Sequence, residues 1–423
     1  MKTRETVKLD SRAQHRVLVL NHVLAGELSA TEAAVYLSLS ERHVRRLLAG
    51  YRGPAGVAVL VHGNTGRTPV NRVSDRLRER LIELASGDYA GINRAHLAEL
   101  LAEREDIVIA ERTLRRILAE AGLPAVRRRR PRGHRSRRER MSQAGLLIQV
   151  DGSRHDWLEG RGPWLTLVGA IDDATGLVTG AVFRLQEDAA GYFGALIQTA
   201  QRYGLPLGVY SDRHGIFWRG KGIPSLAEQF SGERSRTQVG TALELAGIAW
   251  IAARSPQAKG RIERLWGTAQ DRLISELRLA RATTIEQANV VLAAYLARHN
   301  RRFGVAPANP EPAWRPLPAG RSAETIFCFR HVRHVANDGT FSIAGRELMI
   351  AGSTSPAWKG HRIEIQERLD GVLWAHLDDA FWPVVPAPPR PLALRRPRGA
   401  PHKPPPDHPW RRYSPFRPRC QSR

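Results

Sequence analysis

Residues 145–157 read GLLIQVDGSRHDW, a short apolar run that ends in an acid, Asp151. Two more apolar runs follow closely, PWLTLVGAIDDATG at 163–176 and LVTGAVFRLQ at 177–186. Short apolar runs separated by turn residues are typical of a β-meander. The pair Asp172 and Asp173 lies between the second and third runs, where we interpret it as part of a turn.

The elements that follow the meander narrow the choice of fold. Residues 187–204 place five apolar residues on one helical face, namely Ala189, Tyr192, Phe193, Leu196 and Ile197. A strand ending near Asp212, a short helix at 241–247, a strand at 248–253 and a long helix from Pro256 complete the series. Three antiparallel strands, then helix, strand, helix, strand and helix, is the element order of the ribonuclease H-like fold. We therefore predict such an α/β core over residues 145–305.

Three acids of this core are candidate metal ligands. Asp151 and Asp212 each follow an apolar strand, and in the predicted fold these strands are neighbours. Glu263 lies in SPQAKGRIERLWG at 255–267, the start of the last helix. Carboxylates that converge in this way repel unless a cation separates them, and oxygen-only ligands suit Mg²⁺, with Mn²⁺ as a substitute. Two such ions can hold the attacking and leaving oxygens of a phosphoryl transfer.

The residues around Glu263 are basic, which suits a surface that meets nucleic acid. Lys259 lies four residues earlier on the same helical face, where it is predicted to bind a phosphate. Arg261 and Arg264 belong to the same basic run. The alternative is that Glu263 forms only a salt bridge with Lys259 or Arg264.

The composition favours a polyanionic partner. The 423 residues carry a formal charge of +24, from 65 Lys and Arg against 41 Asp and Glu. Phosphates neutralised by such a surface release counterions and draw the protein to DNA, although a basic surface also serves solubility. The two cysteines, Cys328 and Cys420, imply no disulfide framework. With neither an apolar signal core nor a membrane-length apolar run, we expect a cytoplasmic protein associated with a prokaryotic nucleoid.

Residues 1–60 have the pattern of a helix-turn-helix unit. Ser29 and Ser40 stand at capping positions before two short helical segments. The second segment carries Arg42, His43 and Arg46, which we predict to face a DNA groove. A plain three-helix bundle with a charged face is the alternative.

A second helix-turn-helix unit is predicted at 70–123, with Thr113, Arg115 and Arg116 exposed on its last helix. Two such units in tandem can span a longer DNA site than either one alone. The remaining segments are an Arg-rich linker at 124–144, a basic stretch at 298–307 interpreted as a DNA contact, a small SH3-like β-barrel at 321–385 and a disordered basic tail at 386–423.

Three blocks carry a family resemblance: VDGSRHDWLEGRGP at 150–163, YSDRHGIFW at 210–218 and SPQAKGRIERLWGTAQDRL at 255–273. They resemble the catalytic blocks of the DDE transposase and retroviral integrase superfamily, most closely those of the ISNCY group of insertion-sequence transposases. The resemblance implies that Asp151, Asp212 and Glu263 are the catalytic, metal-binding triad and that Lys259 contacts DNA. The 51 positions from Asp212 to Glu263 exceed the family spacing, and the excess lies in 218–240.

The resemblance implies a Mg²⁺-dependent DNA transposase. The helix-turn-helix units would bind the terminal inverted repeats of a mobile element, and the core would hydrolyse the element end and join the freed 3′-hydroxyl to target DNA. Because two double-stranded ends must meet, a homodimer or a larger multimer on DNA is expected. Two alternatives remain at this point: a nuclease of the same fold, and a DNA-binding regulator derived from a transposase.

Overall fold

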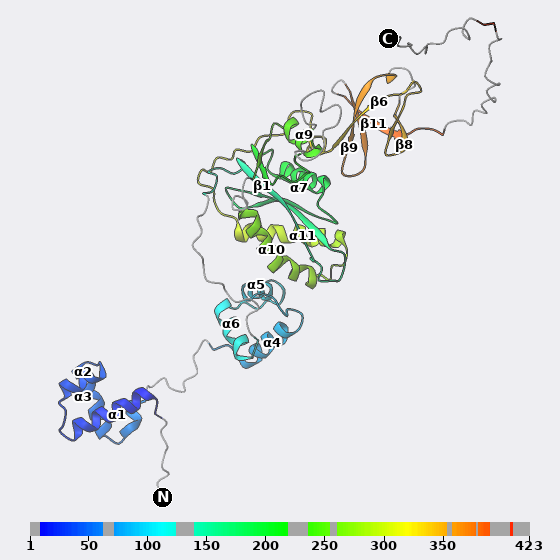
Figure 1. Cartoon of the computed structure of the whole chain (residues 1–423). Helices are drawn as coiled ribbons and strands as arrows, with labels where there is room; N and C mark the ends of the chain where they lie inside the picture. Colours follow the sequence, from blue (N-terminus) through cyan, green and yellow to red (C-terminus); the bar gives the residue numbers. More distant parts are fainter. Residues whose placement is uncertain are drawn as a thin grey trace, which may run out of the picture. The chain divides into compact units, whose positions relative to one another are not determined.

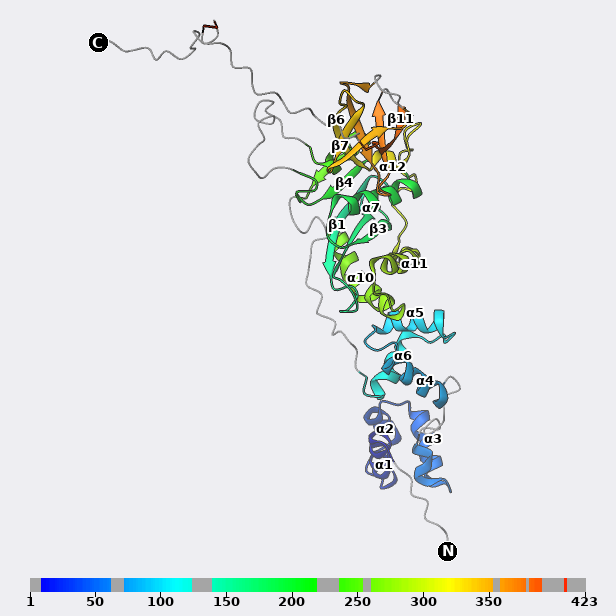
Figure 2. The ribbon, with the colours of Figure 1, turned by 90° about the vertical axis from the view of Figure 1, so that its right-hand side faces the viewer.

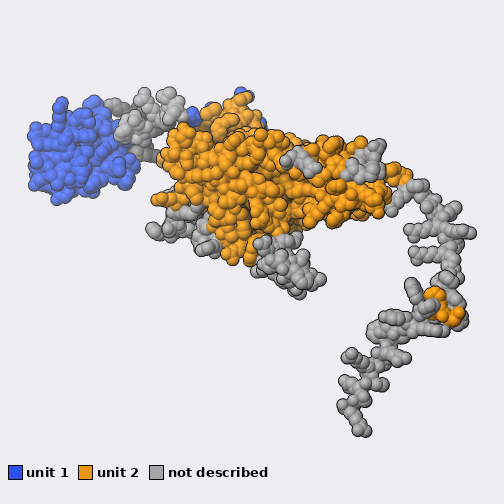
Figure 3. Space-filling view, turned by 90° about the horizontal axis from the view of Figure 1, so that it is seen from above, with its two compact units in different colours: residues 1–86, 116–122 blue, residues 87–115, 123–423 orange. Residues whose placement is uncertain are grey.

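The computed structural model describes residues 9–61, 72–123, 139–218, 236–253, 260–352, 358–377, 380–389 and 407–408. They belong to two compact units, residues 1–86 with 116–122 and residues 87–115 with 123–423, which are coloured separately in Figure 3. Among the helices of these ranges, none has the length and apolar character needed to cross a membrane.

The first unit begins with the helices α1 (Ser11–Leu24), α2 (Ala30–Leu37) and α3 (Glu41–Arg52), followed by the 3-10 turn η1 (Gly56–Leu60). The predicted caps are present: Ser29 and Glu32 form a capping box, and the Ser40 hydroxyl accepts the N–H of His43. Val44, Leu47 and Leu48 of α3 are buried in one core with α1 and α2. The unit also contains α4 (Asp75–Ser86) and the C-terminal half of α6 (Glu111–Glu120).

The second unit is built on a five-stranded sheet. Its strands are β1 (Leu147–His155), β2 (Leu165–Asp172), β3 (Val178–Arg184), β4 (Gly208–Ser211) and β5 (Ala249–Ala252), in the order β3-β2-β1-β4-β5. The first three are antiparallel, whereas β4 runs parallel to both β1 and β5. The predicted adjacency of the first and fourth strands is therefore confirmed.

Helices cover both faces of this sheet (Figures 1 and 2). One face packs against α7 (Ala189–Arg202) and α9 (Gln238–Leu245), and the other against α10 (Gly260–Leu279) and α11 (Ile285–Phe303). Side chains alternate along a strand, so Val168 of β2 joins the α7 core and Leu167 joins the α10 core. The predicted order of strands and helices is present.

Two details of the core differ from or refine the sequence interpretation. Asp151 does not end its strand, because β1 continues to His155 while pairing with β2. Asp172 is the last residue of β2 and Asp173 begins the predicted turn, but both are buried, at 1% and 0% exposed. Their carboxylates accept hydrogen bonds from the N–H groups of Gly145 and Met141, respectively.

The helix α5 (Arg94–Arg104) belongs to the second unit rather than to a separate domain at 70–123. Ion pairs and hydrogen bonds join it to α10 and α11, as described below. This is the largest difference from the predicted organisation, and its cause is tertiary contact that no local pattern reveals.

The C-terminal part is a six-stranded sheet in the order β6-β9-β10-β11-β8-β7, and it is nearly closed because β6 and β7 also touch. Its strands are β6 (Phe329–His334), β7 (Thr340–Ile343), β8 (Arg346–Ile350), β9 (Arg362–Glu367), β10 (Leu373–Leu377) and β11 (Ala380–Pro386). The range predicted as a β-barrel, 321–385, begins with a short helix, α12 (Ala323–Ile326), before its first strand. Most of the expected tail, and most of the Arg-rich linker, lie outside the described residues.

Candidate catalytic site

Asp151 on β1 and Asp212, the residue after β4, lie at the same level of the sheet. The parallel register pairs Leu147 with Gly208 and Gln149 with Tyr210, so its continuation sets Asp151 level with Asp212. In parallel strands, residues at one level point to the same face. The β4 strand ends at Ser211, which leaves the two aspartates beside each other where the β1–β4 ladder stops.

Both carboxylates are held by N–H donors. The indole Nε1 of Trp266 donates to Asp151 Oδ2 at 3.1 Å, and the backbone N of His214 donates to Asp212 Oδ1 at 3.0 Å. Trp266 is buried in the α10 core, as expected for a packing residue. Its hydrogen bond to Asp151 was not foreseen, and it ties α10 directly to the site.

Glu263 lies one helical turn before Trp266, in the first turn of α10, and is exposed. No ion pair joins it to Arg264 or to any other residue that the structure describes. Lys259, the other candidate for such a pair and the predicted phosphate contact, lies outside the described residues, as do 254–258.

A buried ion pair between Arg261 and Asp173 holds the start of α10 against the sheet. Arg261 Nε donates to Asp173 Oδ1 at 2.7 Å, and the Arg261 side chain is only 10% exposed. The fully buried Gln149 also donates to Asp173 Oδ1, at 2.8 Å, and accepts the N–H of Ile262 at 3.3 Å. Arg261 is thus part of the support of the helix, and its assignment to the DNA-facing surface was wrong.

The resemblance implies a divalent cation, and the donor chemistry of the site can be tested against it. Two aspartates at one level of the sheet, with a glutamate on the adjoining helix, offer only oxygen ligands, which suit Mg²⁺ or Mn²⁺. Within the described ranges, however, no three His, Cys, Asp or Glu side chains are close enough together to hold a metal ion. The types of ligand at the site suit a hard cation. Because the three side chains are not close together, the role of Glu263 as third ligand stays a prediction.

The predicted groove-facing residues of the first unit lie on α3. Arg42 and Arg46 are exposed and His43 is half-buried. On α6, Thr113 is half-buried, while the guanidinium groups of Arg115 and Arg116 pair with Glu111 and Glu120. Ion pairs this exposed are weak, so the α6 arginines can exchange their partners for phosphate. The structure leaves these DNA contacts as predictions.

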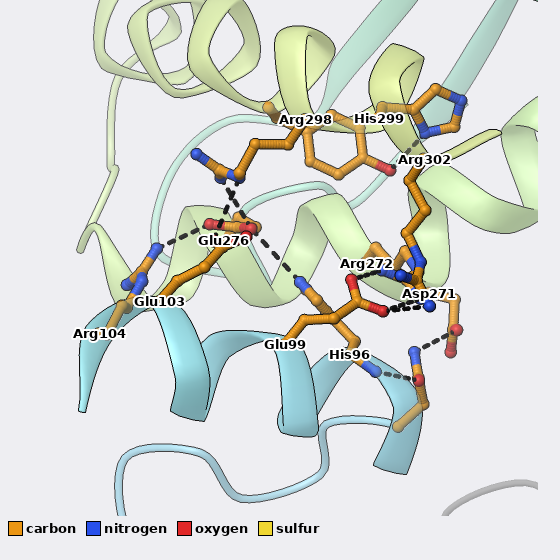
Figure 4. Close-up of polar contacts among 12 residues, drawn as sticks. His96, Glu99, Glu103, Arg104, Asp271, Arg272, Glu276, Arg298, His299 and Arg302 are labelled. Carbon is orange, nitrogen blue, oxygen red and sulfur yellow. Dashed lines mark hydrogen bonds and ion pairs between the residues drawn. The ribbon is translucent and has the colours of Figure 1, made fainter. Parts of the chain in front are cut away.

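A second polar site joins α5 to α10 and α11 (Figure 4). Glu276 of α10 is 2% exposed and receives Arg104 Nη2 at 2.7 Å, Arg298 Nη2 at 2.8 Å and His96 Nε2 at 3.3 Å. Burial by itself would raise the pKa of Glu276, but hydrogen bonds from His96 and Arg298 outweigh burial and lower the pKa to about 2. The carboxylate is therefore charged at neutral pH and neutralised by its partners.

Glu99 of α5 extends this network, pairing at 2.7 Å with both Arg272 and Arg302. His299 of α11 lies in the same layer, and burial, helped by Arg272, lowers its pKa to about 4. Arg298 and Arg302 belong to the basic stretch at 298–307, so two of its arginines serve contacts within the protein rather than standing free for DNA. Sequence spacing gave no signal for this cluster.

The chain is similar to two transposases over most of its length. It is 35% identical over 369 residues to "Putative transposase y4bF" of Sinorhizobium fredii (strain NBRC 101917 / NGR234), covering 87% of this chain and 79% of that protein. It is 32% identical over 356 residues to "Transposase for insertion sequence IS1202" of Streptococcus pneumoniae, covering 74% of each. No family model matches the chain.

Among solved structures, a simian T-cell lymphotropic virus intasome chain is 16% identical, with a TM-score of 0.30, covering 72% of this chain and 96% of that one. The HTLV-2 integrase catalytic core in complex with magnesium is 15% identical, with a TM-score of 0.27, covering 44% and 97%. Scores this low carry no further conclusion. The chain is at least 32% identical to both transposases over at least 74% of either relative, and it therefore belongs to the family of these transposases.

Proposed function

We propose that this protein is a DNA transposase that binds the terminal inverted repeats of its element, cleaves the 3′ ends and joins them to target DNA. The observation that carries this proposal is the common level of Asp151 and Asp212 on two parallel strands, with α10 fastened to Asp151 through Trp266. Neighbouring carboxylates favour a cation bound between them, and such groups are typical of functional sites.

In this proposal Asp151, Asp212 and Glu263 are the catalytic residues and the ligands of Mg²⁺ or Mn²⁺. The bound cation would neutralise charge that develops on the scissile phosphate. β1 carries Asp151, Asp212 follows the end of β4, and Glu263 on the first turn of α10 would complete the set of ligands when the cation is bound. Lys259 would bind the phosphate next to the scissile bond.

DNA binding is assigned to the basic helices. The side chains of Arg42, His43 and Arg46 on α3 would read base edges in the major groove, and Thr113, Arg115 and Arg116 on α6 would add contacts in a second helix-turn-helix unit. With an excess of 24 positive charges, the affinity should fall steeply with salt. Two element ends must be joined in one event, so a dimer or larger assembly on DNA is part of the proposal.

The test uses purified full-length protein and labelled DNA from the flanks of its gene, with Mg²⁺ or with EDTA. Nicking at a defined position and a joined product are expected with Mg²⁺, and both should vanish with EDTA and in Asp151→Asn. Thr166→Val, a change of a buried residue on the neighbouring β2, is a control for general damage to the sheet.

Nicking without joining would favour a nuclease of the same fold. Specific binding without cleavage under either metal would favour a DNA-binding regulator derived from a transposase. Cleavage that persists in Asp151→Asn would show that the assigned acid is not catalytic.

A further inference from the structure

Tyr192 of α7 is a buried tyrosine whose hydroxyl reaches toward the acids. The residue is 1% exposed, and its hydroxyl donates to Glu187 Oε1 at 2.5 Å. Burial raises the pKa of Tyr192, and the charges of Glu187, Asp151 and Asp212 raise it further. The hydroxyl therefore remains protonated and donates a hydrogen bond, which satisfies the Glu187 carboxylate.

Glu187 in turn lies directly against Gly152, the residue after Asp151. A Cβ on Gly152 would stand 2.7 Å from Glu187 Cδ and 2.8 Å from Oε2, so that the end of the Glu187 side chain would have to move. Since side chains alternate along β1, Gly152 faces the α7 side of the sheet and Asp151 faces the α10 side, where Trp266 meets it. Glu187 therefore contacts β1 on the face of the sheet opposite to the Asp151 carboxylate.

The ring of Tyr192 touches the other aspartate's loop. It packs edge-on against Phe217, with ring centroids 4.7 Å apart and an interplanar angle of 75°. Phe217 N donates to the carbonyl of His214 at 2.9 Å, and His214 N donates to Asp212 Oδ1. One buried residue thus contacts the supports of both aspartates, through its hydroxyl on one side and through its ring on the other.

We propose that Glu187 and Tyr192 are positioning residues of the catalytic site, which fix Asp151 through Gly152 and the Asp212 loop through Phe217. This inference rests on the proposed function, because it assumes that the two aspartates act on DNA. The part played by Glu187 is that of a hydrogen-bonded support behind the sheet. Its charge is not required, only an acceptor of the right shape for the Tyr192 hydroxyl.

The experiment compares Tyr192→Phe, Glu187→Ala and Glu187→Gln in the full chain. The single-turnover rate of end cleavage at saturating DNA, the DNA dissociation constant and the melting temperature are measured for each. Tyr192→Phe and Glu187→Ala should cleave about 10-fold to 100-fold more slowly, the cost of a misplaced reacting group, with unchanged DNA affinity. Glu187→Gln should retain most of the rate, because the amide oxygen accepts the same hydrogen bond.

Tyr295→Phe is the matched control, since it removes the hydroxyl of a tyrosine that is 4% exposed and bonded to His299, away from the aspartates. It should cleave at the wild-type rate. Wild-type rates in Tyr192→Phe and Glu187→Ala would overturn the inference, and so would a Glu187→Gln rate as low as that of Glu187→Ala. If Asp151→Asn does not cleave, the proposed function stands, whatever the rates of the Tyr192 and Glu187 variants. If Asp151→Asn cleaves, the proposed function fails, and this result does not depend on Glu187.

Discussion

Replacing Glu276 by Gln removes the charge at the centre of the α5–α10–α11 cluster while keeping the size of the side chain. The pKa of this carboxyl falls from 4.5 to about 2 in the folded protein. At about 1.4 kcal/mol per pKa unit, the charged form contributes about 3 kcal/mol to the free energy of unfolding. Removing one partner of a buried ion pair costs about 3–5 kcal/mol in general, which agrees with this value.

The sign of the pH dependence follows from the lowered pKa. The contribution is present in full above about pH 4.5 and is lost as the pH falls toward about 2, because the unfolded chain takes up the proton first. Glu276→Gln should therefore unfold with a melting temperature about 6–12 °C lower at neutral pH, taking 2–4 °C per kcal/mol for a unit of this size. As the pH falls toward about 2, the melting temperatures of Glu276→Gln and of the wild type should become equal.

The assay is thermal unfolding of the full chain, followed by tryptophan fluorescence across this pH range. Glu159→Gln is the control, since Glu159 also pairs with an arginine of α10, Arg278 at 3.2 Å, but is exposed. It should change the stability by roughly 0–1 kcal/mol. Equal melting temperatures of Glu276→Gln and wild type at neutral pH would refute the reasoning, and so would a difference that persists unchanged in acid.

Three further substitutions test other contacts. His299 has its folded pKa lowered to about 4 from 6.5, so wild-type stability should fall as the pH drops through that window; in His299→Gln this part of the fall should be missing from the melting curves. An unchanged pH slope would contradict this. Arg261→Ala should destabilise the protein by about 3 kcal/mol and slow cleavage, because it strips Asp173 of its buried partner. A loss of DNA affinity with unchanged stability would instead make Arg261 a DNA contact. Gly152→Ala should cost about 1–3 kcal/mol through the clash with Glu187, and Glu187→Ala should recover part of it, whereas additive losses in urea unfolding would exclude the clash.

The features that the sequence predicts well depend on neighbours along the chain. The capping box of Ser29 and Glu32 spans three residues, and the caps at Ser29 and Ser40 were confirmed. The adjacency of the strands before Asp151 and Asp212 also followed, because the element order leaves few ways to arrange the sheet. Because side chains alternate between the two faces of a strand, Asp151 faces the α10 side of β1.

The features that it could not predict depend on residues far apart in the chain. His96 and Glu276 are separated by 180 positions, and nothing in either local pattern marks them as partners. An arginine in the first turn of a helix looks the same in the sequence whether it points to DNA or inward, so Arg261 was misassigned. Asp173 was correctly placed in a turn, but its burial and its pairing with that arginine come only from the fold.

The union of α5 with α10 limits where the chain can be divided. A fragment that starts at residue 139 would keep the whole sheet, yet it would leave Glu276 without His96 and Arg104, and Arg298 without Glu103, all of which α5 supplies. A carboxylate that is 2% exposed in the intact protein would then face water on that side. The shortest fragment that keeps the five-stranded sheet together with these contacts has to begin before Arg94. An exchange of the N-terminal region between related transposases has to transfer α5 together with α10, the helix that it contacts.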